Sequence, residues 1–268
     1  MRSCRFAPAG ALLLLAAASI GCNRLKARDQ LNKGVNAFRG AQFQQAIDHF
    51  QQAATLDPNL LNARLYLAMS YFQQYAPGGD SQDNVKIGKQ AVDAFDNVLE
   101  VDANNATALA YIGLLYYNMK DFDKAKEYEQ RRAQAQPNDP EPYYWIGVID
   151  YDHCLRNQAT VRNSDAKLAT LNASGELLPL PEKLRTGLFD KNHSQVDEGM
   201  QALQKAIELR PNYNDAMAYL NLLYRQKADI EPEAGARTAD IKAANEWLAK
   251  ALQARAQATA SGASSAAH

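Results

Sequence analysis

Three stretches of the chain share one pattern: residues 46–59 read AIDHFQQAATLDPN, residues 91–104 read AVDAFDNVLEVDAN, and residues 199–212 read GMQALQKAIELRPN. In each, a small residue is followed four places later by a large apolar residue, and three places after that by alanine or valine. Steps of three and four residues share one face of a helix. The pattern therefore predicts an amphipathic helix that ends near the proline or the alanine that replaces it.

Two weaker matches begin at Ala125 and Ala244, and each of the five stretches follows another helical segment. The combined period is 34 residues, and on these motifs the chain resembles the tetratricopeptide-repeat (TPR) family. The resemblance implies an all-α fold, a right-handed α-solenoid of about five helix-turn-helix units over residues 27–258. Long inserts are expected in units two, four and five, and the largest covers about residues 156–195.

The spacing also has a physical reason. Small residues such as Gly34, Gly113 and Gly147 let the two helices of a hairpin approach closely, and a large residue such as Phe50 fills the space beside them. A single hairpin of this size cannot bury its apolar surface alone. The hairpins are therefore expected to stack on one another in chain order.

The first 21 residues are typical of an export signal. Arg2 and Arg5 precede an uncharged run that is too short to span a bilayer. The run ends in Ser19-Ile20-Gly21-Cys22, which resembles the lipobox of bacterial lipoproteins. The resemblance implies acylation of Cys22, a short linker over residues 22–26, and a membrane anchor through the N-terminal lipid. Asn23 after the cysteine implies the outer membrane, with the protein facing the periplasm. Ordinary cleavage after residues 16–18, giving a soluble periplasmic protein, is the alternative.

Composition and motifs narrow the function further. The 29 basic and 30 acidic residues give a net charge of −1, which argues against a nucleic-acid partner. The chain lacks the motifs of zinc peptidases, phosphate-binding loops, dinucleotide-binding turns and serine hydrolases. We therefore expect no enzyme activity, no cofactor and no metal. Cys154 is the one cysteine left when Cys4 is removed and Cys22 acylated, and it is expected to be buried.

One polar cluster, Asp150 to Cys154 with His193 beyond it, keeps an enzyme open as a less favoured alternative. Its residues do not all share one helix face, so a single metal ion is not expected to collect them. Asn192 or Ser194 is expected to cap a helix that begins near Gln195.

Aromatic residues recur at the sixth and twelfth places of the units, which in this family face the concave side. Eight of these ten positions are aromatic; Asn32 and Arg225 are the exceptions. The aromatic groove predicted from them accepts a peptide or protein segment. Packing between neighbouring hairpins is the alternative. Including the neighbouring Tyr144, the candidate partner-binding residues are Phe38, Tyr66, Phe72, Tyr111, Tyr117, Tyr144, Trp145, Tyr151 and Tyr219.

The last helix, over about residues 239–255, is expected to carry Ile241, Ala244, Leu248 and neighbours on one apolar side with Trp247 at its edge. Residues 259–268 are expected to form a disordered tail. The tail, a partner or a second copy is expected to cover the surface near Trp247. Together these features predict a lipid-anchored scaffold that binds another envelope protein. A soluble chaperone or ligand-binding protein remains the alternative, and the oligomeric state stays open.

Overall fold

The computed structural model describes residues 9–170 and 179–265, and the chain divides into two compact units, Met1–Met119 and Lys120–His268. Within the described ranges, all regular structure is helical: ten α-helices and one short 3-10 helix, without a strand. The prediction of an all-α fold is confirmed.

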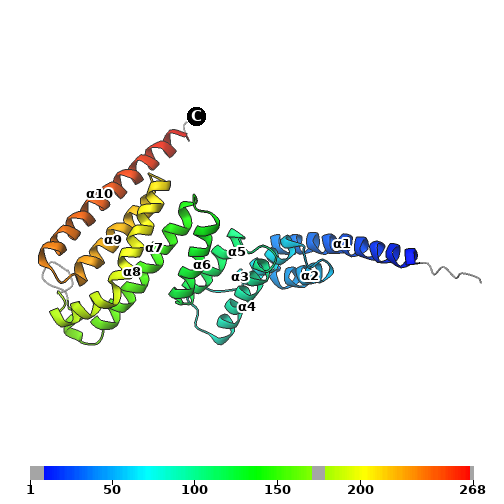
Figure 1. Ribbon diagram of the computed structural model, residues 1–268, viewed down its shortest axis with the longest axis horizontal. Helices are drawn as coiled ribbons and strands as arrows, with labels where there is room; N and C mark the ends of the chain where they lie inside the picture. The colour runs from blue at the N-terminus through cyan, green and yellow to red at the C-terminus, as the bar shows by residue number, and fades with distance from the viewer. Residues whose placement is uncertain (1–8, 171–178, 266–268) are drawn as a thin grey trace, which may run out of the picture. The chain divides into compact units, whose positions relative to one another are not determined.

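The first unit consists of five helices, and each packs against the next one along the chain. The first helix also contacts the third. The first two run side by side as a hairpin (Figure 1). The helices are α1 (Ala9–Arg39), α2 (Phe43–Leu56), α3 (Leu61–Phe72), α4 (Gln82–Leu99) and α5 (Ala106–Asn118).

Close approach within the first hairpin depends on Gly34. A Cβ added at this position would lie 2.5 Å from Cε1 of Phe50, which is fully buried. Because real Cβ contacts are longer than this, only glycine fits between α1 and α2 at this point. The predicted pairing of a small residue with a large one is confirmed here.

The insert predicted in the second repeat, which lies within the first compact unit, forms a turn followed by extra helix. Ser81 caps α4 by accepting a hydrogen bond from the backbone N–H of Asn84. The buried Asn84 side chain accepts from the backbone N–H of Ala76 and donates to the carbonyls of Ala76 and Gly79, each at 2.8 Å. The amide thus satisfies backbone groups that the turn leaves unpaired.

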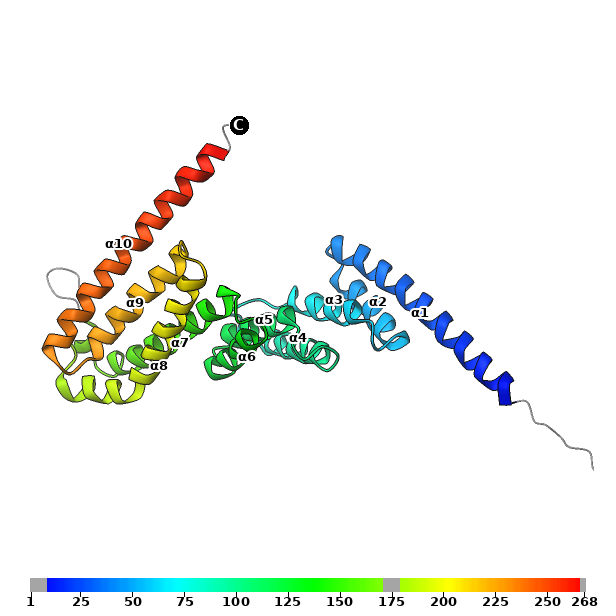
Figure 2. The ribbon, with the colours of Figure 1, turned by 45° about the horizontal axis from the view of Figure 1, so that its top comes forward.

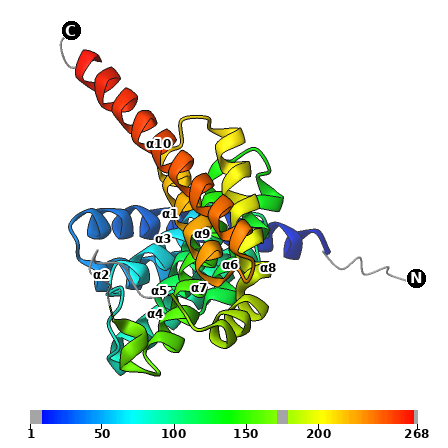
Figure 3. The ribbon, with the colours of Figure 1, turned by 90° about the vertical axis from the view of Figure 1, so that its left-hand side faces the viewer.

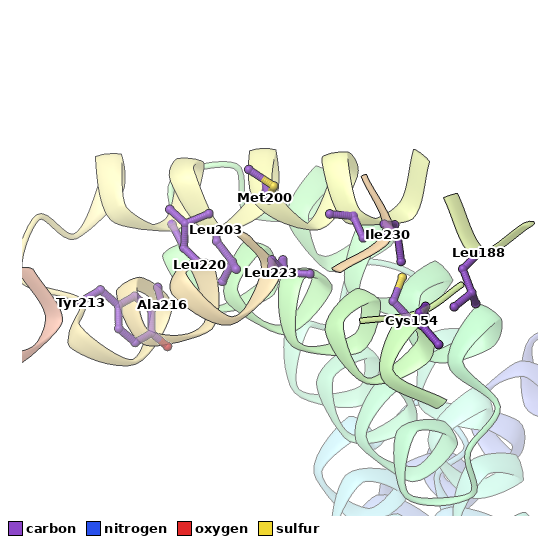
Figure 4. Close-up of a cluster of buried hydrophobic side chains, with 12 residues drawn as sticks. Cys154, Leu188, Met200, Leu203, Tyr213, Ala216, Leu220, Leu223 and Ile230 are labelled. Carbon is purple, nitrogen blue, oxygen red and sulfur yellow. The ribbon is translucent and has the colours of Figure 1, made fainter. Parts of the chain in front are cut away.

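The second unit consists of α6 to α10 with a short 3-10 helix, η1. Its core, drawn in Figure 4, lies mainly among α7, α8 and α9 and includes Leu203, Leu220 and Leu223, all fully buried. The elements are α6 (Phe122–Ala135), α7 (Pro140–Arg162), η1 (Ala166–Ala169), α8 (Glu182–Leu209), α9 (Asn214–Ile230) and α10 (Ala234–Ser265).

The predicted insert at residues 156–195 is largely helical. Helix α7 continues to Arg162, and α8 begins at Glu182, thirteen residues before the start predicted near Gln195. That predicted start is wrong because Asn192 is buried inside the helix pair: its Nδ2 donates to the carbonyl of Cys154 at 3.3 Å, and its Oδ1 accepts from Asn157 Nδ2 at 2.8 Å. Residues 171–178 lie outside the described part of the chain.

Both ends of the described chain are helical. Residues 9–26, predicted to belong to the export signal and linker, form the first part of α1, and residues 1–8 lie outside the described part. At the other end α10 continues to Ser265 and includes residues 259–265 of the predicted tail. Alanine, the best helix former, is frequent leading into this segment, at five of the ten positions 251–260. Residues 266–268 lie outside the described part. Among the described helices, none is long and apolar enough to cross a membrane.

Helix α10 is longer than α9 and packs against it over part of its length. Figures 1, 2 and 3 agree that it extends beyond the end of α9. Its inner side packs Trp247, Ala251 and Ala254 against Met217 of α9 and Ile207 of α8. The apolar side predicted for this helix is therefore divided: Ala244 and Ala251 are buried, whereas Ile241, Leu248 and Leu252 face solvent.

Candidate functional site

The nine aromatic residues predicted to bind a partner are all half-buried. Each of them therefore has one side against the protein and another accessible from outside. They belong to both units: Phe38, Tyr66, Phe72, Tyr111 and Tyr117 to the first, and Tyr144, Trp145, Tyr151 and Tyr219 to the second.

In the first unit the rings form a repeated trio. Tyr66 stacks on the buried Phe50, with ring centroids 5.5 Å apart, and meets Phe38 edge-on at 5.9 Å. The pattern recurs further along the chain, where Tyr111 stacks on Phe95 at 5.0 Å and meets Phe72 edge-on at 4.7 Å. Phe72 comes 34 residues after Phe38, and Tyr111 comes 45 residues after Tyr66. Packing between hairpins, the alternative considered from the sequence, thus accounts for one side of each tyrosine.

In the second unit the aromatic cluster is larger. Tyr219 meets Tyr144 at 5.7 Å and Tyr151 at 5.6 Å, both edge-on, and Tyr144 also contacts Trp145 at 5.8 Å. Burial raises the pKa of Tyr144, Tyr151 and Tyr219, with nearby acidic groups and tyrosines adding to it. These hydroxyls therefore stay protonated at neutral pH and keep a hydrogen-bond donor available.

Tyr213 belongs to this cluster but was not among the predicted site residues. Its ring lies 5.0 Å from that of Tyr144, and its hydroxyl donates to Glu141 Oε2 at 3.0 Å. Arg210 donates to the other oxygen of Glu141 at 2.7 Å and lies over the Tyr213 ring. Tyr213 immediately precedes α9, so it lies outside the helix periodicity from which the site residues were predicted. The one signal in the sequence that could have drawn attention to it is the Pro211-Asn212 turn directly before it.

A groove runs over α9 beside the Tyr151–Tyr219 contact. One cavity of about 350 Å³ lies over α7 and α9, where Tyr151, Gln158 and Gln226 line it. A second of about 460 Å³ lies over α9 and α10 and is lined by Arg237 and Thr238, among others. Three residues line both cavities and make them one groove: Arg225, Asp229 and Ile241.

A partly buried ion cluster joins three helices of the second unit. Lys126 on α6 donates to Asp150 Oδ1 on α7 at 2.9 Å and to Glu198 Oε2 on α8 at 2.5 Å. Asp150 is 1% exposed, and its burial, only partly offset by Lys126, raises its pKa to about 7. The hydrogen bond from Lys126 lowers the pKa of Glu198. The cluster therefore links α6, α7 and α8 to one another.

The residues of the enzyme alternative do not converge on one site. His193 is exposed on α8, where its ring stacks on Phe189 and its Nδ1 lies 2.8 Å from the Phe189 carbonyl. Cys154 is fully buried as predicted, and burial raises the pKa of its thiol to about 12, far above that of a nucleophilic cysteine. The described residues contain no group of three or more His, Cys, Asp or Glu arranged to hold a metal ion.

Residues 106–137, which span α5 and α6, match the model of the tetratricopeptide repeat. The fold is of the TPR type. Among solved structures, MamA has a TM-score of 0.56 and 16% identity, covering 87% of this chain and 93% of that one. MamA from residue 41 onward of Desulfovibrio magneticus RS-1 has a TM-score of 0.54 and 18% identity, covering 87% and 96%.

YrrB, described as "a TPR protein with an unusual peptide-binding site", has a TM-score of 0.53 and 16% identity, covering 89% of this chain and 96% of that one. At these identities the likeness concerns the fold. A comparison with curated proteins found no match.

Proposed function

We propose that this protein is a scaffold that binds a peptide or protein segment on the side of its hairpins where the aromatic residues recur. The observation that carries the proposal is the half-burial of all nine side chains. Tyrosine and tryptophan fixed on one side by packing lose little entropy on binding and still offer apolar area with a polar tip.

The groove beside Tyr151 supports the same proposal in the second unit. It is open, it lies over α7 and α9, and it is lined by Tyr151, whose ring contacts Tyr219 of the aromatic cluster. The likeness to YrrB, which has a peptide-binding site, agrees with a peptide as ligand. Helical-repeat folds use extended surfaces of this kind to hold other proteins.

We further propose that the scaffold works in the cell envelope, held to the outer membrane by acyl chains on Cys22. The sequence before Cys22 supports this, and the Cys22 side chain is exposed. Two or more acyl chains give stable anchoring without a membrane-spanning helix. Mass spectrometry of the mature N-terminus tests it: an acylated Cys22 is expected, and an unmodified N-terminus within residues 17–19 would establish the soluble alternative.

Site-specific photo-crosslinking in living cells tests the binding surface. A photoreactive residue at Tyr111 or Tyr151, one in each unit, is expected to capture a discrete partner. The same residue at Lys89 or Lys205, exposed on α4 and α8, serves as the control. Capture only from the control positions would place the binding surface elsewhere.

A further inference from the structure

The groove over α9 continues into an apolar stripe on α10. Ile241, which lines both cavities of the groove, is 40% exposed, and Leu248 and Leu252 are 38% and 58% exposed. Steps of seven and eleven residues return to the same side of a helix, so the three side chains form one stripe. At 1.5 Å per residue the stripe is about 16 Å long, which matches three turns of a docked helix.

The groove end of this stripe has positive charge that no carboxylate offsets. Arg225 donates to the neutral side chains of Asn221 at 3.0 Å and Asn245 at 2.8 Å. Arg237 donates to the backbone carbonyls of Glu231 and Pro232, at 2.9 Å and 2.6 Å. Among the ion pairs formed by the described residues, none includes either arginine.

Among the described residues that line the groove, the one carboxylate already forms an ion pair. Asp229 accepts from Arg162 Nη2 at 3.0 Å, and the Arg162 side chain is 8% exposed. A charged ligand therefore meets two arginines whose present partners are uncharged. Such a site favours negative charge, because a carboxylate adds a charge-assisted hydrogen bond that the asparagine and carbonyl partners do not supply.

We propose that this surface docks an acidic amphipathic helix of a partner protein. Its apolar side rests on Ile241, Leu248 and Leu252, and its carboxylates face Arg225 and Arg237. The proposal rests on the proposed scaffold function and adds the chemistry of the ligand. A second copy bound through its first mature residues does not fit, since the exposed Leu25 there is flanked by Arg24, Lys26 and Arg28.

Selection from a random 16-residue peptide library, displayed on phage against the mature chain as cells produce it, tests the proposal without assuming a partner. Selected peptides are expected to place Glu or Asp beside leucines at helical spacing. Their binding is expected to weaken about tenfold in the double variant R225E/R237E. It is also expected to fall as salt rises, because exposed charges are screened.

Controls separate charge from folding. The variant K191E/K205E makes the same charge change at two exposed positions on α8, which contributes no side chain to the groove, and is expected to bind as the parent does. Replacing the glutamates of a selected peptide with lysines is expected to restore its binding to R225E/R237E. Should that variant unfold, R225Q/R237Q removes the charges with a smaller change.

Two outcomes would overturn the inference. If selected peptides are neutral or basic, or bind both charge variants equally, the acidic ligand is wrong while the scaffold function stands. If no peptide is selected and Tyr111 and Tyr151 capture nothing in cells, the scaffold function fails with it.

Discussion

Leu203 on α8 lies directly against Gly147 on α7, so that a Cβ at position 147 would stand 2.3 Å from Leu203 Cγ. Leu203 is fully buried and belongs to the core of the second unit (Figure 4). The separation of these two helices is therefore set by the absence of a side chain at one position.

Replacing this glycine is expected to destabilise the protein. G147A forces Leu203 or the helix backbone to move, and we expect the free energy of unfolding to fall by about 2 kcal/mol. The matched control is G187A on α8, where an added Cβ meets nothing within 4 Å. That change should stabilise by up to about 1 kcal/mol through helix propensity. Urea denaturation of both variants decides the matter; equal effects would contradict the close approach.

Asp150 gives the protein a defined pH dependence. Burial raises its pKa from 3.8 to about 7, so the folded state binds a proton that the unfolded state has released between these values. Stability from this group is therefore full below about pH 4 and is lost as pH rises through about 7. Between pH 5 and 8 we expect it to contribute a decline on the order of 2 kcal/mol in the free energy of unfolding.

The variant D150N should lack this part of the decline, as measured by urea denaturation at several pH values. D190N removes an exposed carboxylate on α8 and is expected to keep the parent's slope. Burial also raises the pKa of Glu129 to about 8, with Arg132 opposing it, so a residual slope of the same sign remains in D150N. A D150N curve parallel to that of the parent would show that Asp150 does not titrate in this range.

The thiol of Cys154 is expected to resist modification. It is fully buried, and its pKa of about 12 leaves almost no thiolate at pH 7.5. In a variant with Cys22 replaced by serine and residues 1–21 removed, maleimide should react at least about a thousand times more slowly than with a free cysteine. Reaction should accelerate on unfolding in urea. Rapid labelling of the native protein would mean that α7 and α8 separate readily at this point.

The tyrosine of the first aromatic trio tests packing against binding. Y66A removes the ring stacked on Phe50 and is expected to cost about 2 to 4 kcal/mol of stability. Y66F keeps the ring and should cost less than about 1 kcal/mol, because it removes only the hydroxyl of a half-buried side chain. Thermal unfolding measures both. A Y66A protein as stable as the parent would remove the packing role and leave the ring free for a ligand.

The repeat pattern predicted the contacts that depend on one hairpin. The positions of Gly34 and Phe50, and of Gly147 and Leu203, follow from spacing along the chain, and the structure brings each pair together. The candidate binding surface was predicted less completely. In the repeat pattern Arg225 was an exception to the aromatic residues and was not among the predicted site residues. Its partners, the uncharged Asn221 and Asn245, follow only from the packing of α9 and α10.

By itself, the sequence determined that the chain is built from helical hairpins and which small and large residues meet within a hairpin, because both follow from periodicity within one or two helices. Tertiary structure alone decided that Asn192 is buried within α8 instead of capping it, and that Ile241, Leu248 and Leu252 face solvent while Trp247 packs inward. These outcomes depend on residues far away in the chain, such as Cys154 and Met217, whose positions are fixed only when the helices pack.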